Sequence, residues 1–210
     1  MDADLLIWIN SMHNVFLDTF LWNVSGKWIW IPMYTVMVYL LIKRFGKQSI
    51  WIILTLLLAF FLSDYISHEI KHLVCRPRPS RDEALKGIVN LVGGYKGGKY
   101  GFPSSHASNT FTIALLFSLI WKEWRSVVPV MLWVAANCYS RMYLAVHYPT
   151  DILAGLTLGA LIALPLYYLL RRTDTIKKDE PQVSPQWLNY ALAGIFLLCL
   201  VACMFIPIKG

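Results

Sequence analysis

The amino-acid sequence predicts an all-α, polytopic membrane protein built as a helical bundle. Hydrophobic residues make up 57% of the 210 residues and charged residues only 15%, whereas soluble domains contain about 45–50% apolar and about 25% charged residues. Six apolar segments also come close to the roughly 20 residues needed to span the hydrocarbon core of a bilayer. We therefore expect a single integral-membrane domain over residues 1–210, with about six transmembrane helices.

Six apolar segments are expected to be the transmembrane helices, and the first and third are short for a span. They cover residues 28–42, 49–70, 106–121, 126–145, 149–170 and 187–206. Tryptophans near the segment ends match the aromatic belt found at membrane interfaces. These are Trp22, Trp28, Trp30, Trp121, Trp124 and Trp187.

The N-terminal stretch over residues 4–22 has a different character. Its apolar residues recur every three to four positions, but Asn10, His13 and Asp18 interrupt them. This pattern is typical of an amphipathic helix that lies in the membrane interface. A spanning helix is the alternative.

The formal net charge of +7 does not indicate nucleic-acid binding, because the cations cluster between the apolar segments. Such cations set membrane topology, contact anionic lipid or bind an anionic substrate. The first apolar segment has only Lys27 before it, but Lys43, Arg44 and Lys47 after it. The positive-inside rule therefore places its C-terminal end in the cytoplasm and the long 71–103 loop outside. Over the whole chain, the 19 Lys and Arg are shared almost equally between the two faces, so this orientation rests on the first helix.

Three polar clusters are expected to meet on that outer face, because successive helices alternate in direction. They occupy residues 71–79, 103–106 and 140–151. Charged residues at membrane depth are costly and rare unless they are used. The middle cluster opens the 106–121 helix, and the first turn of a helix offers free N–H groups and the positive end of the dipole. These features suit a phosphate.

The order and spacing of the clusters resemble the three-part signature of the type 2 phosphatidic acid phosphatase family: K-x6-R-P, P-S-G-H and S-R-x5-H-x3-D. The matching residues are Lys71, Arg78 and Pro79, then Pro103, Ser104 and His106, then Ser140, Arg141, His147 and Asp151. One position departs from the pattern, because Ser105 stands where the family usually has glycine. Glycine allows the backbone to approach phosphate closely, whereas serine keeps the N–H and adds a hydroxyl.

Phosphate binding is assigned to cations and to the helix start. Lys71, Arg78 and Arg141 supply three positive charges for the nonbridging oxygens, whose charge shifts in the transition state. Ser104, Ser105 and the backbone N–H groups that follow Pro103 complete the cradle.

The reacting groups are assigned to the third cluster and to His106. Asp151 falls in the first turn of the helix that begins at Pro149, so its carboxylate reaches back to the His147 ring and fixes its tautomer. His147 is then the nucleophile, which gives a phosphohistidine intermediate. His106 acts as general acid for the leaving oxygen and as base for the attacking water. The family resemblance implies the same roles, with no metal and no cofactor.

Three further features of the sequence each have two possible interpretations. Arg76 either disfavours the wrong register or touches the headgroup. His68 and His72 have the i, i+4 spacing of a metal-binding pair, although interfacial polar residues that brace Lys71 are the stronger interpretation. The glycine-rich stretch 93–101 is either a flexible lip over the pocket or simply a solvated loop.

The leading hypothesis is a metal-independent lipid phosphatase or diphosphatase in a bacterial inner membrane, with its active site facing the periplasm. Its partners are a membrane lipid substrate and the bilayer, and no oligomeric state is predicted. Undecaprenyl diphosphate is the first substrate expected, followed by phosphatidylglycerol phosphate and phosphatidic acid. A lipid A phosphatase and a lipid phosphotransferase are alternatives that use the same site. A vanadium-dependent haloperoxidase is disfavoured by the membrane embedding, and a lipid-binding or transport protein by the intact motifs.

Overall fold

The computed structural model describes residues 2–173, 175–176, 184 and 186–205. Over these residues it is the all-α helical bundle that the sequence predicts, without a β-strand; Pro77 and Tyr100 form an isolated bridge. The helices are α1 (Asp2–Asn10), α2 (Val15–Ser25), α3 (Ile31–Phe45), α4 (Ser49–Val74), α5 (Ser105–Trp121), α6 (Trp124–Tyr143), α7 (Pro149–Arg172) and α8 (Gln186–Phe205).

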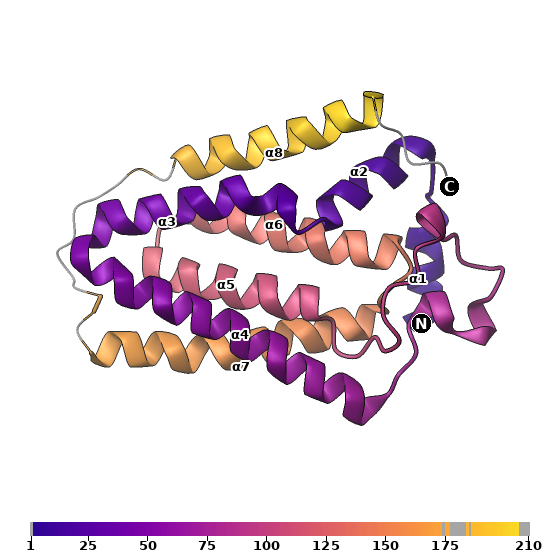
Figure 1. The fold of residues 1–210 in the computed structure, drawn as a ribbon, viewed down its shortest axis with the longest axis horizontal. Coiled ribbons are helices and arrows are strands. Elements are labelled where there is room, and N and C mark those ends of the chain that lie inside the picture. Colours follow the sequence, from indigo (N-terminus) through magenta and orange to yellow (C-terminus); the bar gives the residue numbers. More distant parts are fainter. Residues whose placement is uncertain (1, 174, 177–183, 185, 206–210) are drawn as a thin grey trace.

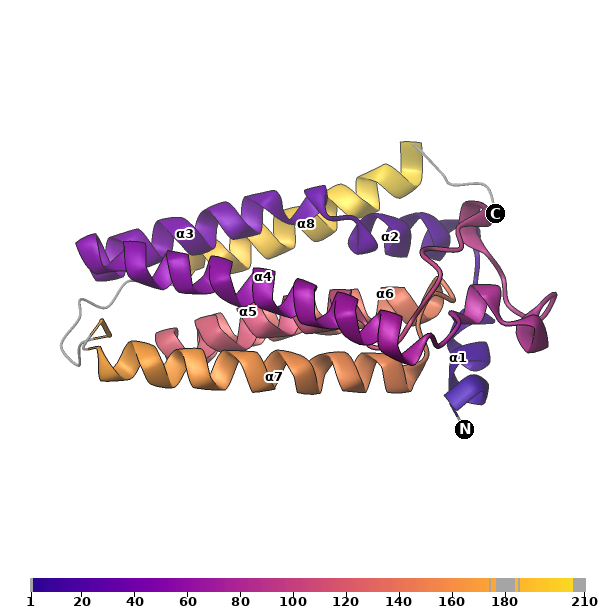
Figure 2. The ribbon, with the colours of Figure 1, turned by 60° about the horizontal axis from the view of Figure 1, so that its bottom comes forward.

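The helices from α3 to α8 run roughly along one axis, whereas α1 lies across one end of the bundle (Figures 1 and 2). The long connection between α4 and α5 covers the same end. Helix α5 lies inside the bundle, packed against α4, α6 and α7, and α8 covers α2, α3 and α6. The starts of α5 and α7 and the ends of α4 and α6 therefore meet beneath α1 and the long loop.

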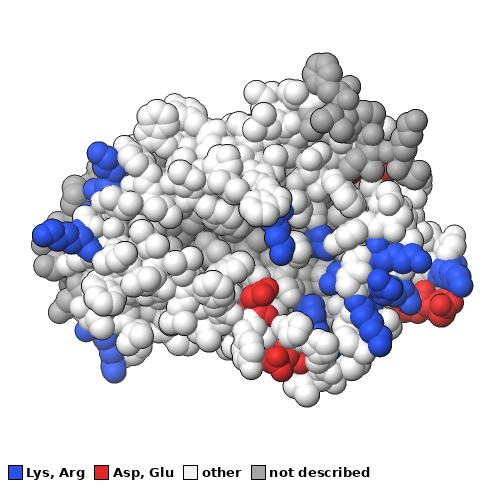
Figure 3. Space-filling model, viewed as in Figure 1, with Lys and Arg blue, Asp and Glu red and all other residues white. Residues whose placement is uncertain are grey.

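The outer surface fits a membrane protein. Large apolar side chains of α4 face outward, among them Trp51, Leu54, Leu58 and Phe61. Lys and Arg are concentrated toward the two ends of the molecule (Figure 3). By length and hydropathy, Trp28–Val74, which contains both α3 and α4, and Pro149–Arg172 are suited to cross a membrane, and Gln186–Val201 is a shorter apolar helix. The count of six spans remains a prediction, and residue 206 of the expected last span lies outside the described residues.

The prediction of a single helix over residues 4–22 is wrong. The structure has two helices there, α1 and α2, with a break between them. Asn14 caps the start of α2 by accepting a hydrogen bond from the Leu17 N–H at 2.9 Å. Asn10 donates to the Tyr143 carbonyl at 2.7 Å, and the Tyr143 hydroxyl donates to Asp18 at 2.5 Å. Asn10 and Asp18, which interrupt the apolar pattern, thus bind the bundle, and the chain turns between them at residues 11–14.

The predicted loop over residues 71–103 begins later than expected. Helix α4 continues through Lys71 to Val74, and Cys75 ends it in a left-handed conformation with φ of 53°. The loop that follows is fastened to the bundle. The Asn90 N–H donates to the Asn10 side chain at 2.7 Å, and the Ser80 N–H donates to the Ala145 carbonyl at 2.8 Å. Lys71 is therefore placed by a helix, not by a loop.

Two glycines set the distance between α5 and α7. A Cβ at Gly155 would lie 2.5 Å from the Ser104 carbonyl oxygen, and one at Gly159 would lie 2.9 Å from the Ser108 carbonyl oxygen. The absence of side chains there allows the two backbones to approach closely. As a result, the first turn of α5 lies directly against the first turns of α7.

Candidate active site

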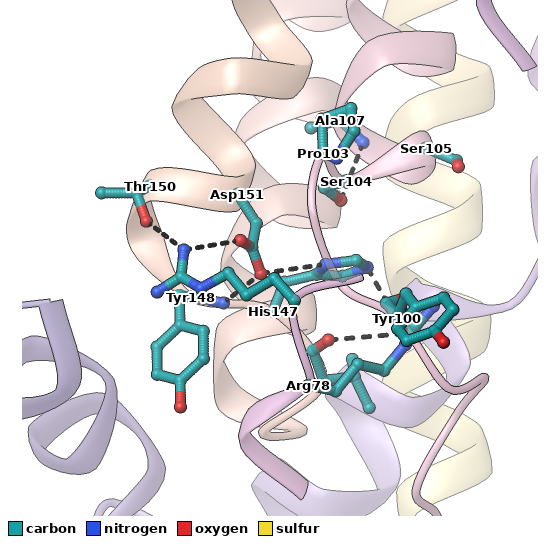
Figure 4. Close-up of polar contacts among 12 residues, drawn as sticks. Arg78, Tyr100, Pro103, Ser104, Ser105, Ala107, His147, Tyr148, Thr150 and Asp151 are labelled. Carbon is teal, nitrogen blue, oxygen red and sulfur yellow. Dashed lines mark hydrogen bonds and ion pairs between the residues drawn. The ribbon is translucent and has the colours of Figure 1, made fainter. Parts of the chain in front are cut away.

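The structure brings the three predicted clusters together at the end of the bundle covered by α1 (Figure 4). The first cluster comes from the end of α4 and the following loop, the second from the start of α5, and the third from the end of α6 and the start of α7. Residues far apart in the sequence thus surround one point, as the alternation of helices predicts.

His147 and Asp151 form a buried pair at the start of α7. His147 lies just before the helix, and Asp151 lies in its first turn. Their exposed fractions are 1% and 0%. Nδ1 of His147 lies 3.5 Å from Oδ2 of Asp151, and the Tyr148 N–H donates to that same oxygen at 2.9 Å. On the other side of the ring, Nε2 lies 3.4 Å from Nη1 of Arg78. The carboxylate therefore faces one ring nitrogen and a cation faces the other, as the sequence predicts for a nucleophilic histidine.

The electrostatic surroundings keep the His147 ring neutral. Burial is the main cause, followed by the positive charges of Arg78, Arg141 and Lys71, and together they hold the pKa of His147 well below its ordinary value of 6.5. A neutral ring at pH 7 has one unprotonated nitrogen, which is what nucleophilic attack requires.

Arg78 is fixed beneath the glycine-rich stretch. Its Nε donates to the Tyr100 carbonyl at 3.1 Å and its Nη1 to the Val146 carbonyl at 3.4 Å. A Cβ at Gly97, whose φ is +63°, would lie 2.8 Å from Nη1. Burial, with the charge of Arg141, lowers the pKa of Arg78 to about 10, so the guanidinium remains charged at neutral pH. The glycine-rich stretch is thus packed over this guanidinium.

The second cluster is held by Lys71 and by α7. Lys71 Nζ donates to the Pro103 carbonyl and, at 2.7 Å, to the Ser105 hydroxyl, which also lies 2.8 Å from the Ser67 hydroxyl. Ser104 is fully buried; its Oγ accepts from the Ala107 N–H at 3.4 Å, and its N–H donates to the Asp151 carbonyl at 2.9 Å. The hydroxyl at the position where the family usually has glycine is therefore engaged by α4.

Arg141 is a buried cation at the end of α6, with an exposed fraction of 3%. It donates to the Ser25 hydroxyl, and its guanidinium carbon lies 5.9 Å from the centre of the Tyr95 ring. Its buried Nε has no hydrogen-bond partner among the described residues. Since a buried charge is costly unless it is paired, this side chain is suited to an anion.

Arg76 is the main site residue whose role the sequence does not predict. Its Nη1 donates to Asp151 Oδ1 at 2.9 Å, and its Nη2 donates to Asp2 at 2.7 Å. Its guanidinium carbon lies 4.1 Å from the centre of the Tyr148 ring. The Arg-Pro-Arg-Pro run contains a partial signal for this, because residues i and i+2 of an extended segment point to the same side, so both arginines face the site. Arg78 faces His147, and Arg76 faces the far oxygen of Asp151.

His106 on α5 and the pair His68 and His72 on α4 are the remaining histidines that the sequence singles out. His106 lies in the first turn of α5, where its carbonyl accepts from the Thr110 hydroxyl at 2.7 Å. The His68 and His72 ring centres are 4.6 Å apart. Within the described part of the chain, no group of three or more His, Cys, Asp or Glu side chains is arranged to hold a metal ion.

A cavity of about 540 Å³ leads from the site into the bundle between α3, α4, α5 and α6. Ser105 and His106 line its polar end, and its walls include the apolar side chains Leu56, Phe60, Ile113 and Trp133. An apolar cavity that reaches Ser105 and His106 of the site fits a molecule with a hydrocarbon chain and a phosphate.

A helical bundle that joins this cationic histidine site to an apolar cavity defines a phosphatase of membrane lipids. Residues 52–175 match the PAP2 superfamily, and the chain belongs to it. The family resemblance seen in the sequence is thus confirmed, and the chain is a membrane protein and a lipid-phosphate hydrolase.

The chain is similar to several lipid phosphatases in sequence and in fold. The chain is 36% identical over 186 residues to a lipid A 4'-phosphatase of Bacteroides thetaiotaomicron, which covers 86% of this chain and 82% of that protein. It is 29% identical over 168 residues to an undecaprenyl-diphosphatase of Sulfolobus acidocaldarius, with 80% and 76% covered. The crystal structure of a PAP2-type phosphatidylglycerolphosphate phosphatase from Bacillus subtilis has the same fold, with a TM-score of 0.64, 16% identity, and 81% of this chain and 85% of that chain covered.

Proposed function

We propose that this enzyme removes a phosphate from a lipid A-type glycolipid at the periplasmic face of a bacterial inner membrane. The observation that carries the chemistry is the buried His147, with Asp151 at one ring nitrogen and Arg78 at the other. The relative at 36% identity supports the substrate. This choice replaces undecaprenyl diphosphate, the first substrate expected from the sequence, which becomes the second candidate because the apolar cavity also suits a polyprenyl chain.

The first step transfers the phosphoryl group to the protein. Neutral His147 attacks phosphorus through Nε2, the bond between phosphorus and the lipid oxygen breaks, and His106 donates a proton to that oxygen. Asp151 stabilises the positive charge that forms on the ring. The position of His106 at the mouth of the apolar cavity supports its role, because the leaving lipid lies on that side.

The second step frees the enzyme. Water attacks the phosphohistidine, His106 takes the proton from the water, and the bond between phosphorus and Nε2 breaks to release inorganic phosphate. Lys71, Arg78 and Arg141 neutralise the nonbridging oxygens in both steps, with the backbone N–H groups at the start of α5. Ser104 places these N–H groups, and Ser105 acts through Lys71. No metal takes part in this scheme.

A phosphate-release panel tests the proposal. Purified enzyme in detergent is given lipid A, undecaprenyl diphosphate, phosphatidylglycerol phosphate and phosphatidic acid, and lipid products are identified by mass spectrometry. We expect the highest kcat/KM on lipid A, with loss of one phosphate. A higher kcat/KM on undecaprenyl diphosphate would make that lipid the substrate, and transfer of phosphate to an added second lipid would identify a phosphotransferase.

The nucleophile is tested separately by trapping. Brief reaction with a ³²P-labelled lipid and rapid quenching in alkali is expected to leave an acid-labile label on the protein. His147→Asn removes the attacking nitrogen at similar size, so both label and turnover are expected to disappear while thermal unfolding in detergent is unchanged. Retained turnover in this variant would exclude His147 as nucleophile.

A further inference from the structure

A polar seam connects α4 and α5 directly below the phosphate site. On α4 it consists of Asp64, Ser67 and Lys71, whose i, i+3, i+7 spacing places them on one helix face. On α5 it consists of Ser105 and Asn109, one turn apart. Lys71 and Ser67 both contact Ser105, and the Asn109 side-chain N–H donates to Asp64 Oδ1 at 2.9 Å.

The inner end of this polar seam faces the apolar cavity. Asp64 and Asn109 line the same 540 Å³ cavity as Ser105 and His106, among apolar neighbours such as Leu57, Phe60 and Ile113. Asn109 lies one helical turn beyond Ser105, which is a rise of about 5–6 Å. The pair therefore flanks the part of a bound lipid that directly follows its phosphate.

The pair presents hydrogen-bond acceptors to that part of the lipid. Asp64 is exposed to the cavity, and its Oδ2 has no hydrogen-bond partner among the described residues. Oδ1 of Asn109 accepts only a long bond, 3.5 Å, from the Ser108 hydroxyl. A carboxylate among the apolar walls of a cavity is costly to leave unpaired once a lipid chain displaces water. Holding α4 against α5 requires only Oδ1 of Asp64, so Oδ2 is left for a ligand.

We propose that Asp64 and Asn109 form a specificity subsite for hydroxyl or amide N–H groups close to the phosphate of the lipid. The subsite deepens the proposed function, on which it rests, because it selects lipids with a sugar or an amide-linked acyl chain beside the phosphate. A polyprenyl chain has no donor there and leaves the carboxylate unpaired. A site built to bond a donor rejects the analogue that lacks it, because the polar groups that the bound lipid covers then remain unsatisfied.

The test compares two lipid monophosphates that differ in these donors. Ceramide 1-phosphate carries a hydroxyl and an amide N–H near its phosphate, whereas phosphatidic acid carries only esters. Their inhibition constants are measured against whichever lipid of the panel is turned over. We expect wild-type enzyme to bind ceramide 1-phosphate more tightly, and Asp64→Ala to reduce this preference about tenfold, the loss of one good hydrogen bond to a charged group. Thr55→Val is the matched control, since Thr55 lies on α4, is not part of the cavity lining, and donates only to the Trp51 carbonyl among the described residues.

The outcomes separate recognition from simple helix packing. An equal loss of affinity for both lipids, or an unchanged preference, would overturn the subsite. If Asp64→Ala does not fold, Asp64→Asn keeps an acceptor for Asn109 and removes the charge, and the same reduction in preference is expected. A wild-type enzyme that fails on lipid A but shows the Asp64-dependent preference would overturn the proposed substrate and leave the subsite standing.

Discussion

The two carboxylate oxygens of Asp151 have different partners. Oδ2 faces the His147 ring and accepts from the Tyr148 N–H, whereas Oδ1 accepts from Arg76, which Asp2 holds from α1. A carboxylate bonded in this way has little rotational freedom, so it holds the imidazole in one orientation. Arg76 is therefore a positioning residue that acts through Asp151.

Arg76→Gln tests this role. We expect kcat to fall about tenfold with little change in KM, because partners that orient a functional side chain are typically worth 10–100-fold. Removing the cation leaves the charge of Asp151 less compensated beside the His147 ring, which favours the protonated ring, so the acidic limb of the pH profile is expected to move to higher pH. Arg76→Lys should restore part of kcat. Lys86→Gln serves as control, because Lys86 is an exposed loop residue whose one ion pair among the described residues is with Glu83. An unshifted pH profile in Arg76→Gln would show that Arg76 has only a structural role.

The pH dependence of the wild-type enzyme follows from the environment of His147. Its pKa is held below 6.5 by burial and neighbouring cations, so the ring stays neutral as the pH falls through 6.5. Activity that requires the neutral ring is therefore retained there, and the acidic limb of kcat/KM is expected below pH 6.5. Returning samples to neutral pH before a second assay separates this limb from acid unfolding. A limb at or above pH 6.5 would contradict the prediction.

Sequence spacing predicts which residues meet but not which atoms they use. The three clusters identify Lys71, His147 and Asp151, because motif spacing and helix periodicity are local properties. The bond of Arg141 to Ser25 and that of Arg76 to Asp2 join positions more than 70 residues apart. No periodicity encodes such distant pairs. The role of Ser105 also depends on Ser67, which only the packing of α4 on α5 brings near.

At the scale of elements, the site depends on the close contact of α5 with α7. The first turn of α5 carries the helix start that we propose binds phosphate, and α7 carries Asp151. Their separation is set by Gly155 and Gly159, where a Cβ would meet backbone atoms of α5 at less than 3.0 Å. Sequence reasoning finds both helices but not this contact, since a glycine inside an apolar segment does not reveal what lies against it.

Gly155→Ala tests the contact. The added methyl group would lie 2.5 Å from the Ser104 carbonyl, so α5 has to move away from α7 and the phosphate cradle moves with it. We expect a loss of about 1–3 kcal/mol in unfolding free energy, typical of overpacking, and a clear drop in kcat/KM. Thermal unfolding in detergent and phosphate release measure the two effects. Gly194→Ala is the control, because its added Cβ would have no described neighbour within 4 Å outside its own helix backbone.

The N-terminal region shows where element prediction fails. The apolar spacing over residues 4–22 correctly indicates helix, but it contains no information on direction. Buried Asn10 and Asp18 both form hydrogen bonds with Tyr143, at the end of α6. Tertiary hydrogen bonds therefore decide that α1 crosses the end of the bundle, where it supplies Asp2 to the site.

At the scale of the whole molecule, the arrangement of charge and apolar surface defines how the protein lies in a bilayer. The site is at one end, and the Gly46–Gln48 turn is at the other (Figure 1). The orientation inferred from Lys43, Arg44 and Lys47 puts the turn in the cytoplasm and the site in the periplasm.

Cysteine labelling tests this orientation. Cys75 is exposed beside the site, whereas Cys138 and Cys199 are buried. A membrane-impermeant maleimide is expected to label Cys75 in intact spheroplasts. Lys47→Cys in a Cys75→Ser background is expected to react only after permeabilisation. The reverse pattern would place the active site in the cytoplasm.

The hydrogen bond from the Ser104 N–H to the Asp151 carbonyl has a mechanical consequence. Asp151 holds the second cluster through its backbone and orients the third through its side chain, so the two clusters are joined directly. When the bilayer thins or thickens, helices respond by tilting, and neither α3 nor α8 carries a residue of this hydrogen bond. The enzyme is thereby suited to keep its reacting groups aligned in membranes of different thickness and fluidity.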